Sequence, residues 1–348
     1  MPLVIERSRM LKCRSASGPF ARIARDARGA YPRYIEIALI NNMPDSALED
    51  TEAQFFQLLN AASGDVPVRV SLYSLPGIAR GERAQQHIAA SYFDIDGLWA
   101  RHFDALIVTG TEPRQSNLRQ EPYWPHLIEV LDWAQHNINS TVLSCLAAHA
   151  GVLHADGIER HLMPEKKLGV FEIERTDHPL MTGLPDAIRI PHSRWNEVKE
   201  EAIAACGYSI LGRSKEAGVD SFVKKRGRCL FVHFQGHPEY STDTLLREYR
   251  RDVKRYLRRE RETYPGMPRG YFTARAAGLF SEFEMKALKD RSEELMEDFP
   301  DVPTSGSVEN AWSGAAGWIY QNWFNYVASK KSDRSVRAAA VGMRRAAL

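Results

Sequence analysis

With 348 residues, the chain is long enough for one large α/β domain with additions or for two smaller domains. Hydrophobic residues make up 44% and charged residues 26% of it, as in folded globular proteins rather than disordered or membrane proteins. The 46 Lys and Arg residues nearly balance the 44 Asp and Glu residues. The resulting net charge of +2 gives no electrostatic reason to expect nucleic-acid or membrane partners.

The cysteines indicate a reducing environment. Cys13, Cys145, Cys206 and Cys229 form no disulfide framework, and no pair has the C-x-x-C spacing of a zinc or redox site. The first twenty residues contain no continuous apolar segment, and no run of eighteen apolar residues occurs further on. We therefore expect a cytoplasmic protein with no metal site, export signal or membrane span.

Apolar runs bounded by turn residues predict alternating strands and helices from residue 34 onward. In chain order, we expect strands over residues 34–40, 68–75, 104–109, 141–145 and 229–234, and helices over about 45–61, 124–136, 146–150 and 242–259. Such alternation is typical of an α/β fold with a doubly wound, mostly parallel sheet that is flanked by helices.

Changes in composition divide the chain into four parts. Residues 1–31 are predicted to be an N-terminal arm, and residues 32–260 the catalytic α/β domain. Residues 261–329 contain several prolines, a helical segment over 282–296 and an aromatic-rich end, so we expect a helical appendage that packs on the main domain. Residues 330–348 are predicted to be a basic tail.

A nucleophile and its base are predicted at the carboxyl ends of two strands, where ligands bind in doubly wound sheets. Cys145 lies at a strand-to-helix turn, and the positive end of the helix favours its thiolate. His237 follows the strand over 229–234 and would accept the thiol proton and later activate an attacking hydroxyl. Glu239 could orient the imidazole and stabilise its charged form.

An oxyanion hole is expected beside this cysteine. The backbone N–H of Leu146 follows the nucleophile and points to where negative charge develops during acyl transfer. A second amide would come from the Thr109-Gly110-Thr111 turn, where Gly110 permits a close approach, although the sequence leaves open which N–H it is.

Structural roles are the alternative for each of these residues. A small-flanked cysteine that ends an apolar run is often a buried structural thiol, and His-Pro-Glu is often only a turn. Each motif is therefore weak by itself. Their joint placement after two strands of one sheet favours catalysis.

The chain resembles the homoserine O-succinyltransferase/O-acetyltransferase family over residues 34–328. The stretches that carry the resemblance include those around the three catalytic candidates and several others with no predicted chemistry. They are Ile40-Asn-Asn-Met-Pro44, Thr51-Glu-Ala-Gln-Phe55, Asp104-Ala-Leu-Ile-Val-Thr-Gly110, Tyr123-Trp-Pro125, Cys145, Pro191-His-Ser-Arg194, Gly236-His-Pro-Glu-Tyr240, Arg251-Asp-Val253 and Asn322-Trp-Phe-Asn-Tyr326.

The resemblance implies a glutamine-amidotransferase-like, flavodoxin-like fold and a thioester mechanism on Cys145, with His237 as proton acceptor and Glu239 completing the triad. It assigns contacts with the substrate to Lys166, Ser193 and Arg251. Thr111, in the turn after Gly110, is the candidate for the second oxyanion donor. Without the resemblance, a solvated surface charge or a turn hydroxyl would be the simpler interpretation of Lys166, Arg251 and Ser193.

The resemblance also implies small-molecule substrates. Acyl-coenzyme A would be a co-substrate rather than a resident cofactor, the acceptor would be L-homoserine, and family members are often dimers, so a homodimer is one expectation. Methionine biosynthesis is the implied pathway.

The substrates are open in two respects. Arg114 stands where the family usually has a small or acidic residue that influences acyl choice, and its guanidinium could pair with the distal carboxylate of a succinyl group, which acetyl lacks. We therefore hypothesise succinyl-CoA over acetyl-CoA as donor. L-serine differs from homoserine by one methylene and remains an alternative acceptor. A glutaminase or peptidase-like hydrolase could use the same triad, although Ser144-Cys145-Leu146-Ala147 lacks the glycines of those enzymes.

Overall fold

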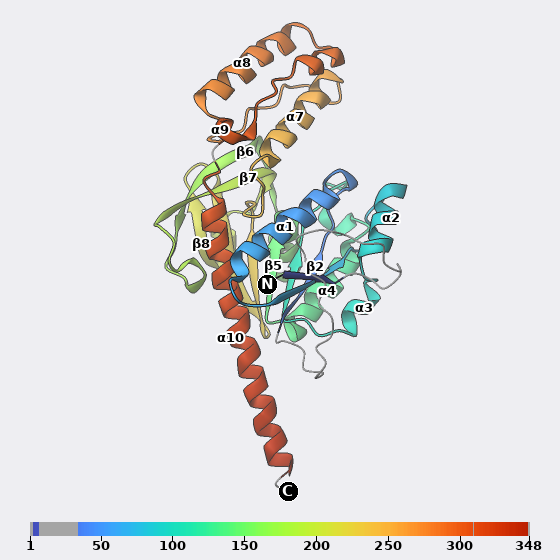
Figure 1. Cartoon of the computed structure of the whole chain (residues 1–348), viewed down its shortest axis with the longest axis vertical. Helices are drawn as coiled ribbons and strands as arrows, with labels where there is room; N and C mark the ends of the chain where they lie inside the picture. The colour runs from blue at the N-terminus through green and yellow to red at the C-terminus, as the bar shows by residue number, and fades with distance from the viewer. Residues whose placement is uncertain (1–2, 7–33, 309, 347–348) are drawn as a thin grey trace.

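A single mixed sheet organises the chain. The computed structural model describes residues 3–6, 34–308 and 310–346 (Figure 1). The strands are β1 Leu3–Glu6, β2 Ile35–Ile40, β3 Val68–Tyr73, β4 Ala105–Val108, β5 Ser140–Ser144, β6 His161–Arg175, β7 Ala187–Glu197, β8 Ser209–Ser214, β9 Gly218–Arg226 and β10 Cys229–Phe234. Their order across the sheet is β1-β3-β2-β4-β5-β10-β9-β8-β6-β7.

Helices connect the strands and extend beyond them. The α-helices are α1 Leu48–Ser63, α2 Glu82–Ser91, α3 Asp96–Trp99, α4 Trp124–Asn137, α5 Leu146–Asp156, α6 Glu200–Ala205, α7 Thr244–Leu257, α8 Ala274–Lys289, α9 Thr304–Ser307 and α10 Ser313–Ala346. Short 3-10 helices are η1 Asp45–Ala47, η2 Leu118–Gln120, η3 Pro179–Met181 and η4 Glu293–Asp298.

The predicted parallel sheet is confirmed in the half of the sheet from β1 to β10, where each neighbouring pair is parallel. Helices cover both faces of this half, and every residue of β4 and of β5 is buried. The other half differs, since β9, β8, β6 and β7 pair antiparallel. The sequence analysis made no prediction for these strands, which lie between residues 161 and 226.

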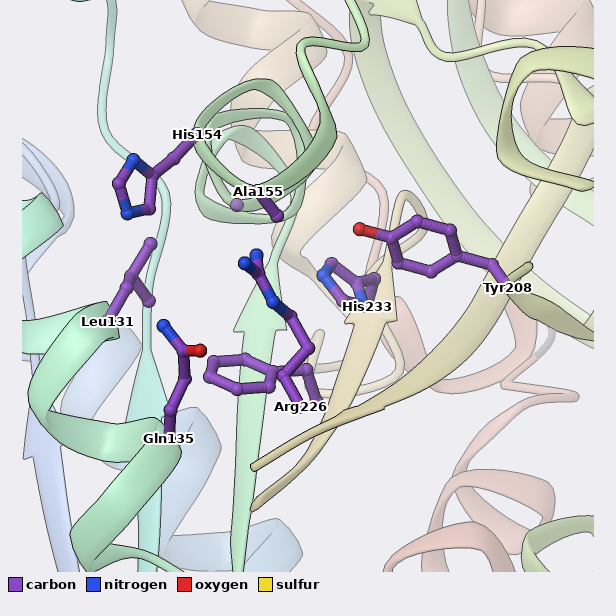
Figure 2. A pocket seen from close by; sticks show the side chains of 9 residues that line it. Leu131, Gln135, His154, Ala155, Tyr208, Arg226 and His233 are labelled. Carbon is purple, nitrogen blue, oxygen red and sulfur yellow. The ribbon is translucent and has the colours of Figure 1, made fainter. Parts of the chain in front are cut away.

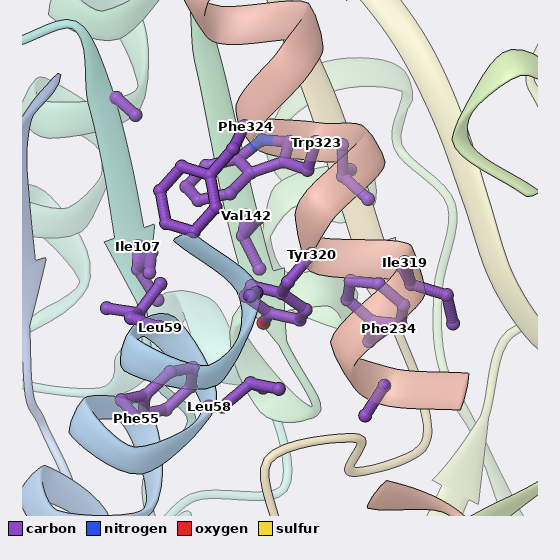
Figure 3. Close-up of a cluster of buried hydrophobic side chains, with 14 of the residues drawn as sticks. Phe55, Leu58, Leu59, Ile107, Val142, Phe234, Ile319, Tyr320, Trp323 and Phe324 are labelled. Carbon is purple, nitrogen blue, oxygen red and sulfur yellow. The ribbon is translucent and has the colours of Figure 1, made fainter. Parts of the chain in front are cut away.

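Alternating side chains divide the core between the two faces of the sheet. Ile107 contacts one apolar cluster, whereas its neighbours Leu106 and Val108 belong to the other. The first cluster lies under α1 and α10, as Figure 3 shows, and the second lies under α4 and α5. The strands are therefore positioned by apolar contacts from both sides.

Helix α10 anchors the end of the chain on this core. Tyr320, Trp323 and Phe324 are fully buried against α1 and the strands beneath it (Figure 3). The indole N–H of Trp323 donates to Ser140 Oγ of β5 over 2.8 Å. The segment predicted as a basic tail begins within α10, which runs to Ala346.

The predicted appendage forms a cluster of its own with α7. Tyr249 and Val253 of α7 pack against Phe280 and Phe283 of α8 and against Phe299. Figure 1 shows these helices at one end of the molecule, beyond β6 and β7. The helix expected over 282–296 lies earlier in the chain, because Phe280 and Phe283 bury one face of a helix that begins at Ala274. The boundaries of the four predicted parts remain predictions.

The N-terminal arm is described in part. Leu3–Glu6 pairs in parallel with β3 at the edge of the sheet, with Leu3 beside Val68. Most of the predicted arm, residues 7–31, lies outside the described residues. Among the described helices, none combines the length and the apolar character that crossing a membrane requires.

Replacing Trp323 by alanine should reduce the free energy of unfolding by about 3–5 kcal/mol, because it removes a fully buried indole and leaves a cavity. Trp318 lies on the same helix and is 51% exposed, so Trp318→Ala is the matched control and should cost under about 1 kcal/mol. Urea denaturation followed by circular dichroism measures both. Equal losses in the two variants would contradict the proposed anchoring role of α10.

Candidate active site

Cys145 occupies a strained turn between β5 and α5. Its backbone has φ 51° and ψ −108°, a conformation that a residue with a side chain rarely adopts. A hydrogen bond of 2.7 Å from the Cys145 N–H to the carbonyl of Phe234 in β10 holds the turn. The residue is partly exposed, so a substrate can reach the sulfur, as a nucleophile requires.

His237 and Glu239 lie beside this turn because β10 is the parallel neighbour of β5. Phe234 and Ser144 are paired in register at the ends of the two strands, and each chain then leaves the sheet at the same edge. His237 Nδ1 lies 2.9 Å from Glu239 Oε1. The hydroxyl of Ser144 donates to the same oxygen over 2.9 Å, so the carboxylate has little freedom to move.

The thiolate and the carboxylate make the imidazole basic. Burial lowers the pKa of His237, but the charges of Cys145 and Glu239 and hydrogen bonds to both act in the opposite direction and outweigh it. The pKa of His237 is therefore raised well above its ordinary value, which favours an imidazolium beside a thiolate. Tyr240 stacks on the His237 ring with centroids 4.2 Å apart and covers one of its faces.

The turn before His237 tolerates only glycine. A Cβ atom at Gly236 would lie 2.4 Å from Asp220 Oδ1 and 2.9 Å from His192 Nε2. These two buried side chains lie 3.1 Å apart beneath the turn. The His237 N–H then donates to the carbonyl of Pro191 over 2.7 Å. The backbone of His237 is thereby attached to β7 as well as to β10.

The predicted oxyanion donors lie next to each other. A Cβ atom on Gly110 would come within 3.1 Å of the Leu146 nitrogen and 3.3 Å of the Ser144 carbonyl, so a side chain at residue 110 would crowd the amide. Thr111 follows directly and lines an open cleft. The structure thus brings the turn after β4 and the start of α5 together beside Cys145.

The three predicted substrate contacts converge on helix α7. Lys166 Nζ lies 2.9 Å from Asp252 Oδ2 and 3.5 Å from Glu248 Oε2. Arg251 Nε donates to Asp252 Oδ1 over 2.9 Å, and the hydroxyl of Ser193 donates to Glu248. All three residues therefore have acidic partners on α7. The simpler interpretation, a solvated surface charge or a turn hydroxyl, predicted no such partners.

Sequence reasoning missed Glu248 and Asp252. The two residues are four positions apart on a helix and therefore share one face. This spacing is the pattern in the sequence that could have indicated an acidic cluster. Burial raises the pKa of Glu248, but the charges of Lys166 and Arg251 and hydrogen bonds reverse this, so the pKa is lowered and the group is a carboxylate. Tyr240 donates to Glu248 Oε1 over 2.7 Å and connects this cluster to the ring of His237.

A cleft of about 340 Å³ opens beside the turn after β4. Its walls come from the loops after β2, β3 and β4 and from the segment between η2 and α4. The lining residues are Pro44, Gly77, Ile78, Ala79, Thr111, Glu112, Pro113, Arg114, Glu121 and Tyr123. The side chain of Arg114 is exposed here, and its backbone N–H donates to Glu121 Oε1 over 2.6 Å. An anionic group in the cleft would meet this arginine.

Figure 2 shows a much smaller cavity between α4, α5 and the ends of β9 and β10. Its volume of about 10 Å³ accommodates one water molecule. His233 lines it, and burial lowers the pKa of this residue to about 3, so the ring is neutral. No catalytic candidate lines this cavity, and it has no part in the chemistry.

Metal ligands are not gathered at the site. Within residues 3–6, 34–308 and 310–346, no group of three His, Cys, Asp or Glu side chains has the geometry to hold an ion. Of the other cysteines, Cys229 is buried, and Cys206 is partly buried against the cluster that contains Ile203. Cys13 is outside the described residues.

Comparison with known proteins identifies relatives over most of the chain. The family model for homoserine O-succinyltransferase matches residues 16–334. A protein named homoserine O-succinyltransferase from Rhodopseudomonas palustris is 43% identical over 304 residues, which cover 87% of this chain and 91% of the relative. The protein of the same name from Bradyrhizobium japonicum is also 43% identical, over 94% of this chain and 99% of its own length.

Solved structures with a similar arrangement are more distant. A glutamine amidotransferase from Thermotoga maritima is 12% identical, with a TM-score of 0.45 over 85% of this chain and 99% of that one. A glutamine amidotransferase from Methylobacillus flagellatus is 14% identical, with a TM-score of 0.46 over 84% of this chain and 95% of that one.

Replacing Glu239 by glutamine should lower the pKa of His237, because the variant loses the carboxylate that stabilises the imidazolium. NMR titration of the His237 ring measures this, and the midpoint should move to lower pH. The pKa of this group is raised by folding, so its contribution to stability is complete below the ordinary histidine pKa and is lost as the pH rises through the folded-state value.

Ser144→Ala is the control for this experiment. It removes one hydrogen bond to Glu239 but keeps the charge, so the pKa of His237 should remain above its ordinary value. An unchanged midpoint in Glu239→Gln would mean that the carboxylate does not determine the protonation of the ring.

Proposed function

Because the chain belongs to the homoserine O-succinyltransferase family, we propose that it transfers a succinyl group from coenzyme A to the side-chain hydroxyl of L-homoserine through a thioester on Cys145. The chain is an acyltransferase, and the reaction is a step of methionine biosynthesis. The observation that carries the proposal is the partly exposed Cys145 beside a basic His237 held by Glu239. We place the reaction in the cytoplasm and expect a homodimer.

The first half-reaction forms the acyl-enzyme. The Cys145 thiolate attacks the thioester carbonyl of succinyl-CoA, a new carbon–sulfur bond forms, and the carbonyl oxygen becomes an oxyanion. The Leu146 N–H and an amide at Thr111 would stabilise this charge. The bond to coenzyme A then breaks, and the departing thiolate takes the proton of the His237 imidazolium. His237 is left neutral, which prepares it to act as a base.

The second half-reaction uses the acceptor. Neutral His237 takes the proton of the homoserine hydroxyl as its oxygen attacks the thioester, and the Cys145 thiolate leaves. The product ester departs, and the enzyme returns to its thiolate–imidazolium state. Glu239 stabilises the imidazolium at both stages because it accepts from Nδ1 throughout.

The cluster on α7 suits an amino acid. We propose that Arg251, whose side chain is 46% exposed, holds the α-carboxylate of the acceptor, because its guanidinium can bond both oxygens. Lys166 and Ser193 would complete the site, since both lie against Glu248. Tyr240 lies between this cluster and His237, so a bound amino acid would have its hydroxyl near the base.

Incubation with succinyl-CoA should add one succinyl mass to the intact protein, and Cys145→Ala should abolish the addition. Intact-mass spectrometry measures the adduct, and subsequent discharge by homoserine or by serine identifies the acceptor. Discharge by serine at an equal or greater rate would favour the alternative acceptor. Ammonia release from glutamine without any acyl adduct would support a hydrolase instead.

The wild-type enzyme should react faster with succinyl-CoA than with acetyl-CoA, and Arg114→Ala should reduce this preference, because we propose that the exposed guanidinium in the cleft attracts the distal carboxylate of the donor. Arg119→Ala is a matched control from the same loop, since Arg119 pairs with Glu159 instead. Steady-state kcat/KM for the two donors measures the preference. A wild-type preference for acetyl-CoA would contradict this role for Arg114.

A further inference from the structure

The inner wall of the cleft contains a buried hydroxyl without a protein partner. Tyr123 is 5% exposed and lines the cleft, and its Oη forms no hydrogen bond with any described residue. A buried hydroxyl that lacks a partner destabilises the folded state, so such groups usually have a ligand or a water molecule to bond. The Tyr123 hydroxyl is therefore available to a group that enters the cleft.

Arg160 lies behind the same wall. It follows α5 closely in the chain, it is partly buried, and its Nη2 lies 3.4 Å from the carbonyl of Ser116 in the loop that carries Arg114. Its charge interacts with Tyr123, Glu121 and Cys145. The partly buried Arg160 thus lies against the loop that lines the cleft.

Arg194 also interacts electrostatically with Cys145, but its donors are already used. Its guanidinium donates to the carbonyls of Asn196, over 2.8 Å, and Ala217. Its Nε donates to His192 Nδ1 over 3.2 Å. Arg194 is therefore part of the packing below the site. Within the described part of the chain, the Arg160 guanidinium donates one long hydrogen bond, so most of its N–H groups can bind a ligand.

Glu121 keeps this wall in place without competing for the ligand. Its Oε1 accepts from the backbone amides of Arg114 and Gln115, at 2.6 and 2.7 Å. The carboxylate is buried and thus holds the loop closed over η2. The negative charge of Glu121 also offsets part of the desolvation cost of the partly buried Arg160 guanidinium.

We propose that the Arg160 guanidinium and the Tyr123 hydroxyl together bind the distal carboxylate of the succinyl group while that group is attached to Cys145. The inference rests on the proposed thioester mechanism. The distal carboxylate of a succinyl thioester is separated from the reacting carbonyl by two methylene groups, so it lies within ~4–5 Å of it. Tyr123 and Thr111 line the same cleft, and Gly110, next to Thr111, lies against the Leu146 amide beside Cys145, so the cleft adjoins the position of the thioester. Arg160 contacts the loop that forms part of this cleft.

The two arginines then have different tasks. Arg114 is exposed at the cleft and acts on the donor while coenzyme A is still attached. Arg160 is partly buried and acts on the succinyl group as it is transferred to Cys145 and in the acyl-enzyme that results. A charge-assisted hydrogen bond in a partly desolvated site is stronger than one at the surface, so Arg160 should contribute more to the choice between succinyl and acetyl groups.

The test measures the first half-reaction by quenched intact-mass spectrometry, with succinyl-CoA and acetyl-CoA in separate reactions. Arg160→Met should slow succinylation of Cys145 by about 10- to 100-fold and change acetylation by less than about threefold, because acetyl has no distal carboxylate. Tyr123→Phe removes only the hydroxyl and should slow succinylation by about 3- to 10-fold. Arg119→Met, a nearby exposed arginine paired with Glu159, should change neither rate.

Alkylation of Cys145 by iodoacetamide shows whether each variant keeps the nucleophile intact, and its rate should remain within about threefold of wild type. Equal slowing with both donors, or no slowing in Arg160→Met, would overturn the inference while the thioester mechanism stands. A wild-type enzyme that neither donor acylates would overturn the proposed function and this inference with it.

Discussion

The parallel pairing of β5 with β10 is the constraint on which the site depends. The two strands end in register at Ser144 and Phe234, and the Cys145 N–H donates to the carbonyl of Phe234. This bond holds the nucleophile in a conformation with positive φ that the residue would otherwise avoid. The same alignment brings the segment after β10, with His237 and Glu239, to the edge of the sheet where Cys145 emerges. A shift in the pairing would separate the base from the nucleophile.

His237 and Glu239, at this edge of the sheet, are already paired in the absence of substrate. The His237 ring interacts with both Cys145 and Glu239, and together they outweigh the effect of burial, so the pKa of His237 is raised. The hydroxyl of Ser144 and the face of Tyr240 fix the carboxylate and the ring, respectively. In the proposed mechanism, such preorganisation would keep the geometry of proton transfer constant through both half-reactions.

Helix α7 connects the sheet to the appendage. One face carries Tyr249 and Val253, which pack into the aromatic cluster with α8, and another carries Glu248 and Asp252, which face Lys166 and Arg251. The appendage therefore stabilises the helix that positions the proposed acceptor site, although it contributes no catalytic candidate of its own. Helix α10 supports the sheet from another side, where Tyr320 stacks on Phe234 at the end of β10.

Local patterns in the sequence determined the parallel strands and the turn at Cys145, because short apolar runs, turn residues and helix formers act over only a few positions. They also indicated Cys145, His237 and Glu239 as candidates for a triad. The family resemblance added Lys166, Ser193 and Arg251. The antiparallel strands between residues 161 and 226, the acidic partners on α7 and the contact of Arg160 with the loop that lines the cleft depend on segments far apart in the chain. Only the tertiary structure decided these, because burial and charge pairing are properties of the folded surroundings rather than of any local stretch.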